Sequence, residues 1–427
     1  MTASVDRKRS LIGFAAVTSL FFAWGFITSN NDPLIVALRA AFSLDYSAAL
    51  LTQIVFFLAY GLLSLPAAWL SSRLGSVDTI LGSLALMAIG CVAVVVSTNA
   101  GSFWPILAAL FVLAAGFTAL QVAANPLAAD LGPPEGRHFR LNFAQAFNSL
   151  GVVLGVHFGS VVMLGDPVLC HGSGTLDAAR RGQLLDAVDQ AFLVMAALLG
   201  ALLLVFLAMR RTVIAVAPNN RQEPSNMFAA LASRWAVFGA VAIGLYVGAE
   251  VSIGSIMINF LNQSHVLGLP LEDAGGYLAN FYWGGALAGR LIGTALLTRV
   301  RATQLLATCG IVATLLCATV LVSDGPIAGY AALAIGFFNS IMFPTIFSIA
   351  LERSGVSQSS TSGLLCVAIF GGAVLPMAVG AIADRFGLGV SFAVPLMAYA
   401  FIASFALAAG GRLFASLEPA ASASPIP

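Results

Sequence analysis

A single carboxylate, Asp32, lies deep within the first apolar stretch of the chain, next to Asn30, Asn31 and Pro33. A charged group in hydrocarbon costs at least about 2.5 kcal/mol, so such residues usually face water-filled paths for ions or substrates. Pro33 removes a backbone donor and interrupts the helix, and the freed carbonyl groups are tolerated where they line a cavity. Asp32 therefore predicts a cation-coupling group at a polar break, although it could instead cap the half-helix that follows Pro33.

Glu250, within the segment "YVGAEVSIGS", is a second candidate for cation coupling. Removal from water favours the protonated form of a carboxyl group, which brings proton uptake and release toward physiological pH. The small residues around Glu250 could equally pack closely and satisfy it, so a structural role and a functional role both stay open. Arg290 is a further charge within an apolar segment, and we expect it either to snorkel or to pair with a carboxylate.

Amide side chains recur at helical spacing in the apolar segments. Gln121 and Asn125 share one helix face, and Asn142, Gln145 and Asn148 share another on the next segment. Amides both donate and accept hydrogen bonds, so with an aromatic face they suit sugars, although any single amide could instead join two helices. The predicted substrate-binding residues are Asn31, Gln53, Gln121, Asn125, Gln145, Asn148, Asn280, Trp283 and Asn339.

Other kinds of chemistry have no motif in the chain. The sequence lacks a cysteine and histidine cluster with metal-ligand spacing, a phosphate-binding glycine loop and a nucleophile elbow. We therefore expect no metal site, no cofactor and no ATP site, and an enzyme is the least favoured class. Four of the five cysteines lie within apolar segments, so no disulfide framework is implied.

Composition defines the class of protein. Of the 427 residues, 59% are hydrophobic and 9% are charged, against about 25% charged residues in soluble domains. Apolar stretches long enough to cross a bilayer recur along the whole chain. They predict an all-α polytopic membrane protein with twelve transmembrane helices, at residues 11–38, 46–70, 77–97, 103–129, 139–165, 187–209, 233–262, 273–298, 303–322, 327–351, 359–383 and 389–411.

The basic residues indicate the orientation of these spans. With the N-terminus inside, fourteen lysine and arginine residues lie in inside loops and tails, and only Arg39, Arg180, Arg181 and Arg385 lie in outside loops. An excess of positive charge on one side marks the cytoplasmic side. We therefore expect a multi-pass protein of the bacterial inner membrane with both termini in the cytoplasm.

The chain divides into two halves at its longest polar inside segment. This segment predicts an N-terminal six-helix bundle at 1–209, a cytoplasmic linker at 210–232, and a C-terminal six-helix bundle with a short tail at 233–427. The halves are weakly similar, as in "AAGFTALQVAANP" and "AIGFFNSIMFP". Two bundles related by an axis along the membrane normal place a substrate site between them at mid-membrane.

Five segments resemble the fucose permease and glucose/galactose permease family of the major facilitator superfamily: "SLFFAWGFITSNNDPLI", "LQVAANPLAADLG", "RLNFAQAFNSLG", "YVGAEVSIGS" and "FPTIFSIALE". The resemblance runs over nearly all spans, and "YVGAEVSIGS" favours the glucose/galactose type. It implies the major facilitator fold and import of monosaccharides with a cation, usually a proton. By the same resemblance, Asp32 matches the family's proton-linked aspartate, and Gln145 and Asn148 match its sugar-contacting amides.

Two positions depart from the family's pattern. Gln121 stands where the fucose permease pattern has a glutamate, and a neutral amide cannot titrate, so coupling is left to Asp32 alone or to Asp32 with Glu250. In the loop after the second span, "AWLSSRLGS" has Ser72 where an acidic residue is expected. The usual charge pair at the inside gate is therefore in doubt.

The combined prediction is a monomeric secondary transporter that imports a hexose, glucose- or galactose-like, with a coupled proton by alternating access. Its predicted partners are the sugar, the proton and the lipid bilayer, and it has no nucleic-acid partner. Sodium could replace the proton as the coupling ion, because Asp32 and the carbonyl groups freed by Pro33 are hard oxygen ligands. The chain could instead be an exporter of amphiphiles or lipids, or a sugar sensor that does not transport.

Overall fold

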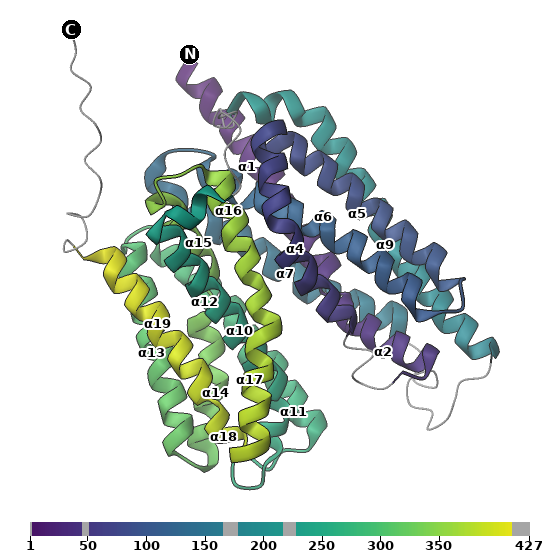
Figure 1. Cartoon of the computed structure of the whole chain (residues 1–427), viewed down its shortest axis with the longest axis vertical. Helices are drawn as coiled ribbons and strands as arrows, with labels where there is room; N and C mark the ends of the chain where they lie inside the picture. Colours follow the sequence, from purple (N-terminus) through teal and green to yellow (C-terminus); the bar gives the residue numbers. More distant parts are fainter. Residues whose placement is uncertain (1, 45–50, 165–177, 217–227, 412–427) are drawn as a thin grey trace.

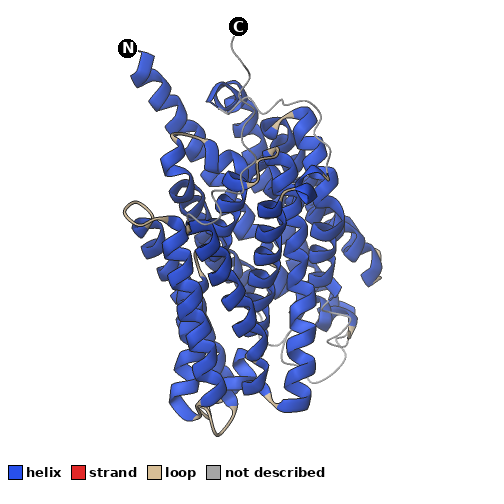
Figure 2. Ribbon diagram, turned by 60° about the vertical axis from the view of Figure 1, so that its left-hand side comes forward, coloured by secondary structure: helices blue, strands red, loops and turns tan. Residues whose placement is uncertain are grey.

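The computed structural model describes residues 2–44, 51–164, 178–216 and 228–411, and all the regular structure in these ranges is helical (Figures 1 and 2). The helices of the first half are α1 (Thr2–Thr28), α2 (Asn31–Phe42), α4 (Leu51–Leu74), α5 (Ser76–Thr98), α6 (Phe103–Asp130), η1 (Pro134–Gly136), α7 (Arg137–Leu164) and α9 (Ala178–Val216).

The second half contains more short segments, because several of its spans are interrupted. Its helices are η2 (Ala229–Ala232), α10 (Arg234–Asn262), α11 (Leu271–Tyr277), η3 (Leu278–Trp283), α12 (Gly284–Leu296), α13 (Ala302–Val322), α14 (Gly325–Asn339), α15 (Met342–Arg353), α16 (Gln358–Val367), η4 (Ala368–Phe370), α17 (Gly371–Phe386), α18 (Leu388–Ser391) and α19 (Ala393–Gly410).

The twelve predicted spans are confirmed. Within the described ranges, ten helical segments are long and apolar enough to cross a membrane. The two remaining spans are α1 with α2, which is broken at Ser29 and Asn30, and α11 with α12, which is joined by the π-helical segment η3. Residues 46–50 of the second predicted span and residue 165 of the fifth lie outside the described residues.

The helices form two groups that lie side by side (Figure 1). Helices α1 to α9 pack mainly on one another, as do α10 to α19, and the groups meet where α16 packs on α4 and α6 and where α12 and α15 pack on α7. Helix α9 continues to Val216, into the segment 210–232 that we expected to be a linker. Residues 217–227 of that segment lie outside the described part of the chain.

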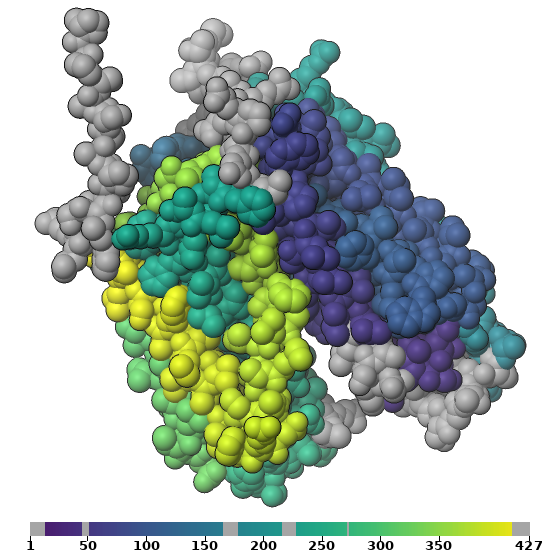
Figure 3. Space-filling model, in the orientation of Figure 1, coloured from purple at the N-terminus to yellow at the C-terminus, as the bar shows by residue number. Residues whose placement is uncertain are grey.

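The two groups touch at one face of the molecule and separate toward the other. We call the face where α1 begins and α19 ends the terminal face, and the opposite face, which carries α2 and α18, the open face (Figure 1). The space-filling view shows a notch between the halves that widens toward the open face (Figure 3). Groups on the facing surfaces of the halves are therefore reached from the open face.

Helix α7 lies unusually close to α1 because of a row of glycines. Gly151, Gly155 and Gly159 are four residues apart, and a Cβ atom added at the first two would collide with the carbonyl oxygens of Phe22 and Phe26. Rows of small residues at this spacing let membrane helices pack backbone to backbone. The contact fixes the end of α1, and with it the helix break, against α7.

This packing predicts a large effect from one methyl group. Gly155→Ala places its Cβ on the Phe26 carbonyl, so we expect the purified protein to lose about 1–3 kcal/mol of stability and to melt at a lower temperature in detergent. The matched control is Gly200→Ala in α9, where an added Cβ meets nothing within 4 Å. Equal melting temperatures for the two variants would contradict the role of the glycine row.

Candidate functional site

The break between α1 and α2 is a stable local structure. Asn30 Nδ2 donates to the carbonyl oxygen of Phe26 at 2.6 Å, and Ser29 Oγ donates to the same oxygen at 3.0 Å. Pro33 lies in the first turn of α2, where its missing N–H would have no helical partner in any case. Polar side chains and proline thus end one helix and begin the next within the span.

Asp32 lies in the first turn of α2 with an exposed side chain. Its carboxylate makes no hydrogen bond or ion pair with any described residue, and no side chain caps α2. The capping role that the sequence left open is therefore not observed. The positive end of the α2 dipole favours the negative charge, but no bond holds it. Asp32 is therefore an exposed carboxylate without a bonded partner among the described residues.

Glu250, by contrast, is held by its own half. Tyr246, one turn earlier on α10, donates its hydroxyl proton to Glu250 Oε1 at 2.7 Å. The Tyr282 hydroxyl donates to the Glu250 backbone carbonyl at 3.4 Å, and Arg290 interacts electrostatically with the carboxylate. The four-residue spacing of Tyr246 and Glu250 is visible in the sequence and could have identified the first of these contacts.

Arg290 joins the two halves near the middle of the molecule. From α12, its Nε donates to the Ser340 carbonyl at 2.9 Å. Its Nη1 donates across to α7, to Ser149 Oγ at 2.5 Å and to the Gln145 carbonyl at 3.2 Å. The sequence predicted a snorkelling side chain or an ion pair. Instead, within the described residues, the guanidinium bonds neutral oxygens of both halves.

Two of the predicted sugar ligands have structural partners. Asn148 Nδ2 donates to the Phe21 carbonyl on α1 at 3.1 Å, so this half-buried side chain helps to hold α1 on α7. Asn339 is fully buried in the second half, where Nδ2 donates to the hydroxyls of Tyr282 and Tyr399 at 3.1 and 3.3 Å. Both amides therefore donate within the protein, although Asn339 Oδ1 has no hydrogen-bond partner among the described residues.

Other predicted ligands lack partners although they are buried. Gln121 Oε1, Gln145 Nε2 and both polar atoms of the Asn125 side chain have no hydrogen-bond partner among the described residues, and the same is true of the half-buried Asn31 at Oδ1. Buried polar groups without partners are uncommon and are often completed by water or by a ligand. These amides are therefore the better candidates for polar contacts with a substrate.

The remaining predicted residues reach the surface between or beside the helices. Asn280 and Trp283 are exposed on η3, and Trp283 lies against Gly254 of α10. π-Helical turns inside α-helices frequently occur at functional sites, because they widen the helix and redirect side chains. Gln53 is half-buried on α4. Of the charged candidates, Asp32 and Arg290 thus lie on helices that pack against α7 and Glu250 lies on α10, whereas the amides are spread over several helices.

Two helical bundles that enclose polar and charged groups and open toward one face define a polytopic membrane transporter. The model of the Major Facilitator Superfamily matches residues 14–365. The chain is 41% identical to the glucose/galactose transporter of Brucella abortus (strain 2308), over 95% of this chain and 96% of that protein. It is 29% identical to the L-fucose-proton symporter of Escherichia coli K12, over 93% and 92% of the two chains.

Comparison with a solved structure also places the chain in this family. The structure of the transporter FucP in the outward conformation superimposes with a TM-score of 0.83 at 27% identity, and it covers 94% of this chain and 99% of that one. The chain therefore belongs to the Major Facilitator Superfamily, in the branch of the glucose/galactose and fucose permeases. It is a multi-pass membrane transporter and not an enzyme.

The contacts of Arg290 make a specific prediction. Arg290→Lys replaces a planar group that reaches three acceptors with a single ammonium, so we expect a loss of about 1–3 kcal/mol and a lower melting temperature in detergent. Arg301→Lys, at an exposed position before α13, is the matched control. A stability loss no greater than that of the control would contradict the bridging role.

Proposed function

We propose that this protein imports a hexose of the glucose or galactose type together with a proton. The observation that carries the proposal is the exposed, unpartnered carboxylate of Asp32 at a helix break beside α7. The relative from Brucella abortus is a glucose/galactose transporter, and the relative from Escherichia coli is a proton symporter for L-fucose. Both relatives match along nearly the entire chain, which supports the same class of substrate.

We propose that the protein lies in the inner membrane of a bacterium and that its open face points away from the cytoplasm. The excess of lysine and arginine in the loops and tails on the terminal side supports this orientation, with both termini in the cytoplasm. The likeness to FucP in the outward conformation supports the same assignment. The two moving units would be the bundles at 1–209 and 233–427, linked by 210–232.

Coupling would follow from the different cost of a charge in the two states. With the open face toward water, Asp32 is hydrated and can be charged. Closure of that face would enclose it, so that closure is favoured once Asp32 is protonated and sugar fills the site. The unpaired amides at Gln121, Asn125 and Gln145 supply polar contacts for sugar hydroxyls, and Trp283 supplies an aromatic face.

The local bonding at the break supports a proton over sodium. The carbonyl oxygens of Trp24, Gly25, Phe26 and Ile27 already accept hydrogen bonds from residues 28–30. A sodium ion would need several oxygen ligands besides the carboxylate, and these carbonyl groups are already engaged in hydrogen bonds at the break. A proton needs only the carboxylate of Asp32. Glu250 already accepts a hydrogen bond from the Tyr246 hydroxyl. We propose that it influences transport through the site but does not bind a second coupling ion.

Substitution of Asp32 tests the coupling. Asp32→Asn should abolish concentrative uptake driven by a pH gradient and leave sugar exchange in proteoliposomes partly intact, because the neutral amide mimics the protonated acid. Asp324→Asn, at an exposed position before α14, is the control and should accumulate sugar normally. Full accumulation by Asp32→Asn would sink the assignment, and accumulation driven by sodium at constant pH would establish sodium as the coupling ion.

Substitution of Gln145 tests the sugar site. Gln145→Ala removes an amide whose Nε2 lacks a protein partner, so the affinity for glucose or galactose should fall by about five- to 150-fold, equivalent to about 1–3 kcal/mol. Gln263→Ala is the matched control, because Gln263 also has an unpaired buried oxygen but lies just beyond the end of α10. Unchanged affinity in Gln145→Ala would assign that residue to packing.

A further inference from the structure

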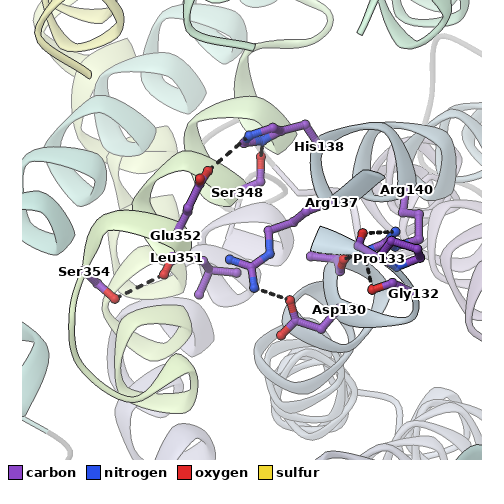
Figure 4. Close-up of polar contacts among 11 residues, drawn as sticks. Asp130, Gly132, Pro133, Arg137, His138, Arg140, Ser348, Leu351, Glu352 and Ser354 are labelled. Atoms are coloured by element: carbon purple, nitrogen blue, oxygen red, sulfur yellow. Dashed lines mark hydrogen bonds and ion pairs between the residues drawn. The ribbon is translucent and has the colours of Figure 1, made fainter. Parts of the chain in front are cut away.

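Another polar contact between the halves lies where α7 begins and α15 ends, near the terminal face (Figure 4). His138, near the start of α7, points to two residues of α15. Its Nδ1 lies 2.6 Å from Ser348 Oγ, and its Nε2 lies 3.2 Å from Glu352 Oε2. One turn further along α7, Asn142 Nδ2 donates to Thr345 Oγ1 at 3.3 Å. These contacts hold the terminal end of α7 to α15.

The protonation state of His138 decides how many of the hydrogen bonds in this contact can form. Ser348 Oγ also donates to the Thr345 carbonyl at 3.1 Å, and a hydroxyl has only one proton to give. If His138 is neutral with its proton on Nε2, Nδ1 can only accept a hydrogen bond from the Ser348 hydroxyl. The hydrogen bond from Ser348 to the Thr345 carbonyl is then lost. If the proton is on Nδ1, no proton remains between Nε2 and Glu352. The imidazolium form, with both ring N–H groups, satisfies all three bonds at once.

The charged groups nearest His138 have partners of their own. Arg137 pairs with Asp130 at 2.6 Å, Arg353 stacks on Trp235 at 5.0 Å, and both also interact electrostatically with Glu352. Arg140 is bonded to the carbonyl groups of residues 129, 132 and 133. Within the described residues, the other charges on elements packed against α7 are Asp6, Arg7, Lys8 and Arg9 on α1, Asp32 and Arg39 on α2, Glu135 on η1, Arg290 on α12, and Asp186, Asp189, Arg180, Arg181, Arg210 and Arg211 on α9.

Among these groups, histidine is the one whose charge ordinarily changes between about pH 5 and 8, since arginines stay charged and carboxylates ionise at lower pH. The contact also takes the place of the charge pair that Ser72 put in doubt. Arg73, in that same loop sequence, stacks on Trp69 at 5.0 Å. At the terminal face, the polar contact between α7 and α15 therefore adds to the packing of α16 on α4 and α6.

We propose that His138 is a proton-binding site that locks the terminal face closed. The closed face binds a proton at His138 more tightly than an open face would, because opening separates α7 from α15 and removes Glu352 and Ser348. By linkage, acid must then stabilise the closed face. With the orientation proposed above, a falling cytoplasmic pH holds the transporter outward-open and slows further proton entry. The device is distinct from coupling at Asp32.

The test measures conformation rather than transport. Spin labels are attached to cysteines at Ala215 and Gln304, exposed residues at the terminal ends of α9 and α13, in a Cys170→Ser background. Distances are recorded without sugar in lipid nanodiscs between pH 8 and 5.5. We expect acid to raise the ratio of closed to open terminal faces, and His138→Gln to reduce that rise by about two- to fivefold, the size expected for a partly exposed ion pair.

The controls separate His138 from other titrating groups. His157→Gln, at an exposed position on the same helix, should keep the pH response of the unsubstituted chain. Glu352→Gln should reduce the response as His138→Gln does, and the double variant should lose no more than either single variant. Should His138→Gln fail to fold, Ser348→Ala, which removes the acceptor at Nδ1, serves in its place.

An unchanged pH response in His138→Gln, or additive losses in the double variant, would overturn the proposal. The measurement needs no sugar and no ion gradient. The pH response at His138 could therefore be observed even if the protein transports another substrate. It could also be missing in a protein that does transport a hexose with a proton.

Discussion

The close packing of α7 on α1 is the constraint on which the rest of the structure depends. The glycine row at Gly151, Gly155 and Gly159 removes every side chain between the two helices at these points, so backbone meets backbone. A Cβ at Gly159 would meet Asn30 and Pro33, the residues that form the helix break. Because the break is held there, Asp32 lies beside α7 in the first turn of α2.

Helix α7 also makes polar contacts with the second half at two positions along its length. In the middle of the molecule, Ser149 and the Gln145 carbonyl receive Arg290 from α12. At the terminal end, His138 and Asn142 meet α15. Both contacts are polar, and each can be exchanged for water at modest cost when the halves move. An apolar interface of the same extent would resist separation more strongly.

The charges inside the bundles differ in how firmly they are held. Glu250 has Tyr246 and Arg290 nearby, whereas Asp32 has no bonded partner among the described residues. An unpartnered carboxylate can remain charged only while water reaches it. In the proposed coupling, the notch between the halves (Figure 3) is the route by which both water and substrate would enter. Unpaired amides such as Asn125 add to the cost of an empty, closed site.

The sequence alone determined the class of protein, the twelve spans and the polar break, because each depends on neighbours along the chain. Hydropathy over about 20 residues defines a span, and Asn30, Asp32 and Pro33 interrupt one wherever it packs. Only the tertiary structure decided which polar groups meet. It gave Asn148 to the Phe21 carbonyl, Asn339 to two tyrosines, and Arg290 to neutral oxygens of α7 in place of a carboxylate. His138 and Glu352 lie more than two hundred residues apart in the chain. Their contact depends on how one bundle packs against the other. Helical spacing within either segment reports only neighbours on the same helix, so it could not predict this contact.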